Sequence, residues 1–266
     1  MLLLFFTPVA GHIVSRVWET AGTQADMYTA NQRVAKASVI SALLGGVFFM
    51  HGTTPVAEAD TMELTFEGMG PRRFIAYSFN DNSETVRGGQ FNWVGDVQTF
   101  CTQLEEDISA GGTVEYRIVP VEFVPDEPPT PGPMGINRAT LVRDLYARWY
   151  DTVMEKVGNE ARDYSAAFQM NIWELTHQDV DDSSASSALA GMSFDSGNAT
   201  FTSNTGVDVL ANEMLNSLGE GGIFRPFASL RGLTSELKQD QLIVIPGASG
   251  LAFGVGLIGV RKRRRR

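Results

Sequence analysis

The chain has 266 residues, of which 43% are hydrophobic and 20% are charged, and its formal net charge is −10. This composition is typical of a globular protein and excludes intrinsic disorder for most of the chain. Residues 60–240 contain 28 acidic and 12 basic residues, a net charge of −16, whereas the terminal RKRRRR adds +6. An acidic body argues against a nucleic-acid partner, because phosphate contacts require basic surface.

A secretory signal is predicted over residues 27–59. Arg33 and Lys36 form its basic start, the run SVISALLGGVFFM forms its apolar core, and Ala57 and Ala59 form an A-x-A cleavage site for signal peptidase. The alternative interpretation of the apolar run is a buried core helix. A signal at this position predicts that the body is exported.

Residues 1–26 carry another apolar run, MLLLFFTPVAG, ahead of this signal. Met27 precedes a signal of normal length. We therefore expect translation to start at Met27, and we interpret residues 1–26 as a mis-assigned upstream extension.

The body begins with a β-rich section. Short runs of aromatic and β-branched residues are separated by the turn-type segments GMGP, DNSETVRGG and GD. Cys101 is expected on one of the strands, and Pro120 marks the last one as an edge strand or a bulge. The predicted strands are 62–68, 72–80, 90–95, 97–104 and 114–125.

A helical section follows. The first predicted helix has Asn137 as its N-cap and ends at Gly158, and the second carries Gln169 and runs to about His177. A polar loop is expected over residues 179–201. The third helix spans about Thr205–Leu218, Gly219 follows as its stop, and residues 241–246 form a last strand. The predicted buried positions are Leu141, Leu145, Trp149 and Val153 in the first helix, and Val207, Leu210, Met214 and Leu218 in the third.

The second helix contains an amide with unusual surroundings. Residues 166–175 predict a short amphipathic helix whose buried stripe is Phe168, Ile172 and Leu175. Gln169 lies beside that stripe and needs a partner, because a buried unsatisfied amide costs about 1–3 kcal/mol. With about three helices and an antiparallel β-rich part, residues 60–240 predict one α+β domain.

The C-terminal segment, residues 241–266, is a sorting or anchor signal by its pattern. The apolar run from Leu242 to Val260 can cross a hydrocarbon core of about 30 Å. A short proline motif, an apolar run and a terminal basic cluster, in this order, resemble the PEP-CTERM sorting signal of envelope-bearing bacteria, with Ile245-Pro246-Gly247-Ala248 in place of Pro-Glu-Pro. The signal residues are Pro246, Gly247, Arg261, Lys262, Arg263, Arg264, Arg265 and Arg266.

This resemblance implies recognition by an exosortase-type membrane protease, which releases the protein or re-attaches it at the surface. A plain C-terminal membrane anchor is the alternative. Both interpretations place the body outside the cytoplasm, because the basic residues at both ends stay on the cytoplasmic side.

The only cysteine, Cys101, and Gln169 lie in segments that resemble the Cys–Gln thioester domains of bacterial surface adhesins. The segment FCTQLEE matches the cysteine-bearing strand, and AFQMNIWEL matches the helix in which a tryptophan follows glutamine by four residues. The resemblance covers residues 88–177. It implies that the Cys101 thiolate attacks the Gln169 amide and expels ammonia, leaving a thioester that a partner's lysine amine opens once. The expected shields against water are Phe100, Trp93, Phe168 and Trp173.

Three interpretations of this pair stay open. Besides the thioester, Cys101 can be an inert buried residue with Gln169 hydrogen-bonded locally. The third is a secreted cysteine-dependent hydrolase in which Cys101 and His177 act as nucleophile and base. A full-mass protein with a reactive thiol would exclude the thioester.

No metal or cofactor is expected. Asp179, Asp181 and Asp182 lack the spacing, the glycine and the distal glutamate of an EF-hand loop. From the export signals and the Cys101–Gln169 resemblance we expect an exported adhesion or interaction protein at the cell surface or in the extracellular matrix, and not an enzyme with catalytic residues. Its expected partners are signal peptidase, an exosortase-type protease and a surface or matrix molecule that bears an amine, and it contacts the membrane through its C-terminal helix before processing.

Overall fold

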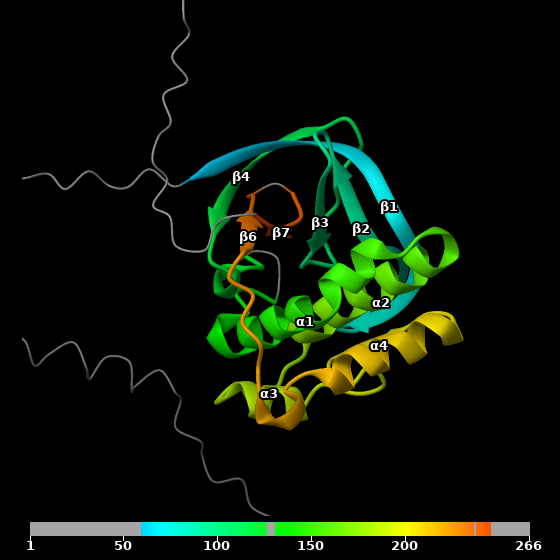
Figure 1. Ribbon diagram of the computed structural model, residues 1–266, viewed down its shortest axis with the longest axis vertical. Coiled ribbons are helices and arrows are strands. Elements are labelled where there is room, and N and C mark those ends of the chain that lie inside the picture. The colour runs from blue at the N-terminus through cyan, green and yellow to red at the C-terminus, as the bar shows by residue number, and fades with distance from the viewer. Residues whose placement is uncertain (1–59, 127–130, 237, 246–266) are drawn as a thin grey trace, which may run out of the picture. The chain divides into compact units, whose positions relative to one another are not determined.

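An antiparallel sheet and four α-helices form the part of the chain that the computed structural model describes, residues 60–126, 131–236 and 238–245 (Figure 1). The predicted α+β class is confirmed for this body. The predictions for residues 1–26 and 27–59, and for the sorting signal from Pro246 onward, fall outside the described residues.

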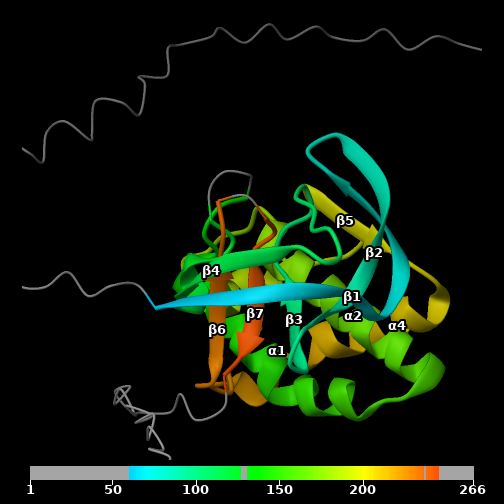
Figure 2. The ribbon, with the colours of Figure 1, turned by 90° about the horizontal axis from the view of Figure 1, so that it is seen from above.

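The sheet has seven strands in the order β2-β3-β7-β6-β4-β1-β5, and β1 also pairs with β2. Six of the strands therefore form a closed ring, because each pairs antiparallel with the next from β1 through β2, β3, β7, β6 and β4 back to β1 (Figure 2). The strands are β1 (Thr61–Phe79), β2 (Asn82–Trp93), β3 (Val97–Cys101), β4 (Thr113–Val119), β5 (Ala199–Thr202), β6 (Leu230–Thr234) and β7 (Gln241–Val244).

Aromatic side chains form a core shared by the ring strands. Trp93 is completely buried, and its ring centroid lies 5.2 Å from that of Phe66 and 5.8 Å from that of Tyr116. Its indole N–H donates to Thr99 Oγ1 at 2.7 Å, and the Thr99 hydroxyl donates to Gln241 Oε1 at 2.9 Å. This chain of contacts links β2, β3 and β7.

The first two predicted strands are one strand. The GMGP segment, predicted as a turn, lies inside β1, where register shifts between Phe66 and Arg72 bend the strand without ending it. The prediction of a turn over DNSETVRGG is also wrong. The hairpin turn is only Asn80 and Asp81, whose φ angles of 48° and 67° suit a two-residue turn, and Asn82 already pairs with Phe79.

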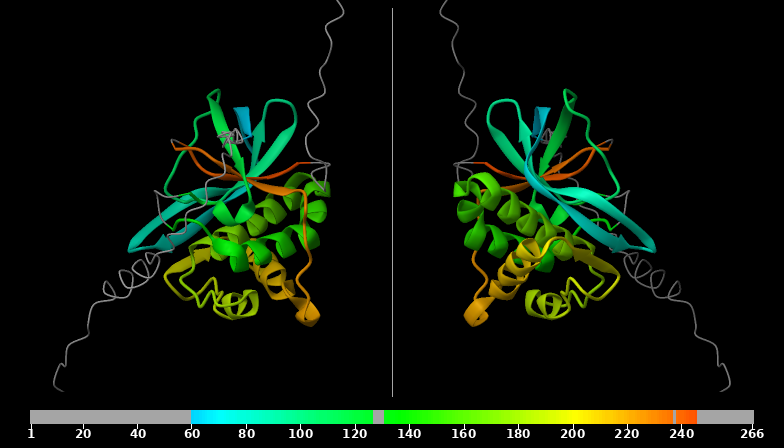
Figure 3. Two further views of the ribbon diagram at one scale, coloured as in Figure 1. Left: turned by 90° about the vertical axis from the view of Figure 1, so that its left-hand side faces the viewer. Right: turned by 90° about the vertical axis from the view of Figure 1, so that its right-hand side faces the viewer.

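The helices lie together beside the ring (Figure 3). The N-cap prediction of Asn137 is wrong, because α1 begins at Gly135 and the Asn137 amide donates to the Asp182 carbonyl instead. Gly158 does not end α1 either. With φ of 64° it forms the turn into α2. The helices are α1 (Gly135–Glu155), α2 (Gly158–His177), α3 (Ala185–Ala190) and α4 (Thr205–Ser217).

Helix α2 is the centre of the domain. It packs against β1 and β2, against α1 and against α4. Every residue from Ser165 to His177 is buried, so the prediction of a one-sided amphipathic helix is wrong, although its stripe of Phe168, Ile172 and Leu175 is completely buried as predicted. Four packed neighbours leave this part of the helix no solvent-facing side.

The segment predicted as a polar loop, residues 179–201, contains α3 and most of β5. β5 pairs with the far end of β1, and the Gln178 side chain donates to the Ala199 carbonyl at 2.8 Å. β6 was not predicted, and β7 agrees with the predicted last strand except at its end. Of the predicted buried positions, Trp149 in α1 and Leu210 in α4 are only partly buried, whereas the others are buried.

Candidate functional site: Cys101 and the Gln169 amide

Cys101 is the last residue of β3, at a place where the strand has a neighbour on one side only. On the β7 side, the Thr102 N–H donates to the Asp240 carbonyl at 2.9 Å. Backbone groups of successive strand residues point to opposite sides, so those of Cys101 point away from β7. β2 pairs with β3 only over Val97–Thr99. The Cys101 N–H and carbonyl therefore lack a strand partner.

The Gln169 side chain fills this place. Its Oε1 accepts the Cys101 N–H at 3.2 Å, and its Nε2 donates to the Cys101 carbonyl at 2.8 Å. The amide behaves like a peptide group of an adjacent strand, and Gln169 is completely buried. The structure thus brings the two residues singled out by the sequence into direct contact.

This contact also orients the Gln169 carbonyl. The Cys101 N–H points at Oε1, where negative charge would develop if a nucleophile added to the amide carbon. The amide carbon of Gln169 carries Oε1 and Nε2, and both of these atoms are hydrogen-bonded to the backbone of Cys101. The sulfur and the amide carbon therefore belong to two residues that are hydrogen-bonded to each other, while the thiol itself bonds the Gln103 carbonyl.

The Cys101 thiol is free, buried and weakly acidic. Its Sγ donates to the Gln103 carbonyl at 3.6 Å. Burial raises the pKa of the thiol to about 12, and the Trp173 indole N–H and backbone hydrogen bonds that Gln103 and Cys101 offer to the sulfur partly oppose this shift. Among the described residues that indole N–H has no carbonyl, carboxylate or hydroxyl oxygen as a partner, so its dipole remains available to a thiolate.

The four residues predicted as shields are all at most 2% exposed. The rings of Phe100 and Phe168 lie 4.8 Å apart and join β3 to α2, which is the interface that carries Cys101 and Gln169. Trp173 stacks with Phe201 at 6.3 Å. Trp93 belongs to the core of the ring described above. The pair is therefore enclosed by aromatic surface on both its strand and helix sides.

A cavity of about 250 Å³ reaches the cysteine. Cys101, Gln103 and Trp173 line it and are buried, whereas Arg87 and Asp107 line it and are exposed. The same cavity thus connects the thiol with solvent. Its size admits a side chain or a small amine but not a folded partner.

A network of polar residues that the sequence did not single out supports the end of β3. Gln103 Oε1 accepts the Asp240 N–H at 2.5 Å, and the Thr176 hydroxyl donates to the Thr102 carbonyl at 3.3 Å. The polar pair Thr102-Gln103 directly after a buried strand was the available signal. These contacts fix β3 to β7 and to α2 beside the cysteine.

His177, the base of the hydrolase interpretation, lies elsewhere on α2. It follows Gln169 by eight residues, or about 12 Å along the helix. Its Nδ1 is within hydrogen-bond distance of the Trp173 carbonyl and the Thr176 hydroxyl, and burial lowers its pKa to about 3. No contact of the described residues joins it to Cys101, so nothing in the geometry favours that interpretation.

Comparison with known proteins gives this arrangement no family. No family model, curated protein or solved structure matches the chain. Among the described residues, no helix is both long and apolar enough to span a bilayer, and no cluster of His, Cys, Asp and Glu side chains is arranged to hold a metal ion. The features that indicate a function are therefore the Cys101–Gln169 contact and the sequence signals at the two ends of the chain.

Proposed function

We propose that this protein is an exported adhesion or interaction protein that forms an internal thioester between Cys101 and Gln169 and uses it to attach covalently to a partner amine. The observation that carries the proposal is the pair of hydrogen bonds by which the Gln169 amide binds the backbone of Cys101. These bonds hold the Gln169 amide beside the residue whose thiol would attack it, which lowers the entropic cost of bringing the two groups together.

Formation of the thioester is a single acyl substitution. The Cys101 sulfur adds to the Gln169 amide carbon, the carbon–nitrogen bond breaks, and the thiol proton leaves with the ammonia. The Cys101 N–H stabilises the charge on Oε1 during the addition. The Trp173 indole N–H favours the thiolate against the opposing effect of burial.

The partner amine would reach the thioester through the cavity that Cys101 lines. A lysine amine adds to the same carbon, the carbon–sulfur bond breaks, and a proton from the amine passes to the released thiolate. The product is an amide on Gln169 and a free Cys101 thiol. Because the original glutamine amide is not restored, each molecule reacts once and is not an enzyme.

The delivery route is part of the same proposal. A signal peptide over residues 27–59 would export the chain, and the PEP-CTERM-like tail would be processed by an exosortase-type protease. β7 takes Gln241–Val244 into the sheet, so the segment left for the membrane begins at about Ile245. The domain would then lie close to the membrane surface before processing.

A non-covalent binding module on the same route is the second candidate. The two hydrogen bonds already satisfy the Gln169 amide, and a thiol pKa of about 12 disfavours the thiolate that attacks. In that case Gln169 serves only to complete the open side of β3. The fold is the same under both candidates, and only the reactivity of the pair distinguishes them.

Methylamine separates these candidates. We expect the mature protein to gain one methylamine at Gln169, located by peptide mapping, and to release one thiol. Asn171 offers an internal control, because it is equally buried on α2 and its amide also bonds backbone carbonyls. Cys101→Ala should abolish the labelling. Equal labelling of the Cys101→Ala variant, or none of the parent protein, would contradict the thioester.

A further inference from the structure

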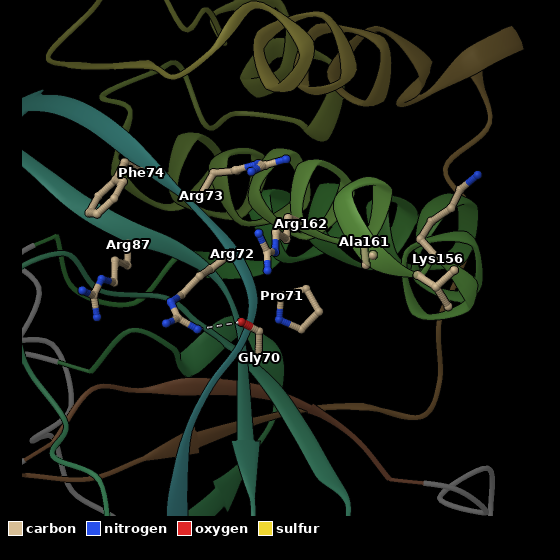
Figure 4. A pocket seen from close by; sticks show the side chains of 11 residues that line it. Gly70, Pro71, Arg72, Arg73, Phe74, Arg87, Lys156, Ala161 and Arg162 are labelled. Atoms are coloured by element: carbon tan, nitrogen blue, oxygen red, sulfur yellow. Dashed lines mark hydrogen bonds between the residues drawn. The ribbon is translucent and has the colours of Figure 1, made fainter.

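A large cavity in the described body lies away from the cysteine. It has a volume of about 670 Å³ and opens between β1, β2 and the start of α2. Figure 4 shows its cationic side chains coming from two sides, the strands and the helix. The cations that line it are Arg72, Arg73, Arg87, Lys156 and Arg162.

Its charge is opposite to that of the body. Residues 60–240 carry only 12 basic residues against 28 acidic ones, yet five of the 12 line this one cavity and none of the acidic residues does. Like charges placed together in a folded protein repel each other, so such a concentration is a cost unless an anion binds there. We call this feature the basic cleft.

Several of these cations are free to bind a ligand. Arg87 and Arg162 are exposed, and Arg72 is partly exposed. None of these three arginines forms an ion pair within the described ranges. The Arg72 guanidinium donates to the Met69 and Gly70 carbonyls at 2.7 Å and 3.1 Å, which fixes its position. The structure therefore presents oriented guanidinium groups, the groups that bind carboxylate and sulfate well.

The remaining two cations are already paired. Arg73 binds Asp163 at 2.6 Å, and Lys156 lies 3.6 Å from Glu160. The start of α2 adds to the positive potential, because Gly158 lines the cleft and Val157 provides no side-chain cap. Arg72, Arg87 and Arg162 are thus the groups on which an anion would depend most.

The cleft also has exposed apolar surface. Phe74 is 62% exposed and Val157 is 80% exposed, and both line the cleft between the cations. The Arg87 guanidinium lies 5.8 Å from the centre of the Phe74 ring. Apolar and aromatic surface next to guanidinium groups suits a ligand that alternates C–H faces with separate anionic groups.

We propose that the basic cleft binds an acidic polysaccharide, a chain of sugars that carry carboxylate or sulfate groups. Sugar rings supply the C–H faces for Phe74 and Val157, and their acid groups pair with Arg72, Arg87 and Arg162. Double-stranded nucleic acid fits less well, because one phosphate charge per about 1.7 Å of helix axis would be repelled by a body of net charge −16. The site does not depend on the thioester, although Arg87 also lines the cavity that reaches Cys101.

The test is binding of a polygalacturonate oligosaccharide to the mature protein, measured by calorimetry at low and high salt. We expect binding that weakens as salt is raised, and no binding of neutral dextran of similar length. The double variant Arg87→Gln/Arg162→Gln should bind about tenfold more weakly, because it removes two charge-assisted contacts. The matched variant Arg117→Gln/Arg225→Gln removes the same charge outside the cleft and should bind like the parent.

Each other outcome overturns the proposal. Equal weakening in both double variants would show that only net charge matters. Dextran binding as tight as that of polygalacturonate would exclude an anion site. Tighter binding of single-stranded oligothymidylate or of anionic phospholipid vesicles would reassign the cleft to nucleic acid or to membrane, and no binding of polygalacturonate would leave the cleft without this ligand.

Discussion

Gln169 is a buried polar side chain whose position is explained by one neighbouring residue. The backbone of Cys101 has a donor and an acceptor on the side where β2 does not continue, and the glutamine amide has the matching acceptor and donor. The pair thus satisfies four polar groups at once in a buried interface. The same contact completes β3 and presents an acyl carbon to a thiol.

Removing this amide should destabilise the fold even where no thioester forms. In a Cys101→Ala background, we expect Gln169→Ala to lower the free energy of unfolding by about 3 kcal/mol, because two backbone groups lose their partners inside the core. Urea denaturation of the two variants measures the difference. A change below about 0.5 kcal/mol would mean that water replaces the amide.

The buried carboxyl group of Glu174 should make the free energy of unfolding depend on pH. Burial raises its pKa from 4.5 to about 7, although the hydrogen bonds from the Ser193 N–H and the Gln178 amide oppose the shift. Between these two values the folded protein holds more protons than the unfolded chain. The contribution of Glu174 to stability is therefore greatest below about pH 4.5 and is lost as pH rises toward 7.

The comparison with Glu174→Gln isolates this effect. We expect the unfolding free energy of the parent, relative to that of the variant, to fall between about pH 4.5 and pH 7. Asp240 has a raised pKa and His177 a lowered one, but both are present in each protein and cancel. A difference that is constant across this range would contradict the raised pKa of Glu174.

At the scale of elements, α2 fits closely against β1 and the middle of β2 at Gly88. A Cβ on Gly88 would overlap the Ile75 side chain and would lie 3.0 Å from the Trp173 ring. We expect Gly88→Ala to lower the free energy of unfolding by about 2 kcal/mol, as overpacking does, and to displace Trp173. Urea denaturation followed by tryptophan fluorescence measures both effects.

Gly112→Ala is the control for this change. Its added Cβ would meet only the Ser109 carbonyl, at 3.2 Å, in an exposed turn. We expect a loss well below that of Gly88→Ala. Equal losses would show that glycine flexibility and not the packing of α2 accounts for the effect.

The elements that the sequence predicted are those with a clear period or clear ends. The run of aromatic and β-branched residues around Cys101 predicted β3, and the apolar spacing in α1 and α4 predicted both helices. GMGP has turn chemistry but is absorbed into β1 as bulges, because the strand has pairing partners on both sides of it. β5 has only four residues, and contacts with β1 and Gln178 hold it, which no local pattern shows.

In the candidate site, too, the sequence predicted the features that depend on local patterns and missed those that depend on distant contacts. Aromatic neighbours in the sequence correctly predicted the burial of Cys101 and Gln169, and Phe100 and Phe168 do pack together. The way in which Gln169 binds Cys101 could not be predicted, because it depends on where β2 leaves β3. The basic cleft was missed for a similar reason: its cations are scattered along the chain between Arg72 and Arg162.

At the scale of the whole molecule, the domain has no disulfide, since the chain contains a single cysteine. A thioester would join β3 to α2 and close a loop between residues 68 positions apart. Such a cross-link restricts the unfolded chain in the way a disulfide does, by about 4 kcal/mol for a loop of this length. The thioester would therefore be the only covalent cross-link between side chains of this domain.

Opening the thioester should remove this contribution. We expect methylamine treatment to lower the free energy of unfolding of the parent protein by about 4 kcal/mol and to leave Cys101→Ala unchanged. Urea denaturation before and after treatment measures it. An equal effect on both proteins would attribute the change to methylamine acting elsewhere.

The most direct test of the central claim is the intact mass of the untreated mature protein. The thioester predicts a mass lower by one ammonia than the sequence requires, with the deficit mapped to a linked peptide pair that contains Cys101 and Gln169. Cys101→Ala and Gln169→Ala should each restore the full mass expected for the variant. A parent protein of full mass, whose thiol reacts with alkylating reagents once unfolded, would contradict the account and leave Gln169 as a structural partner of β3.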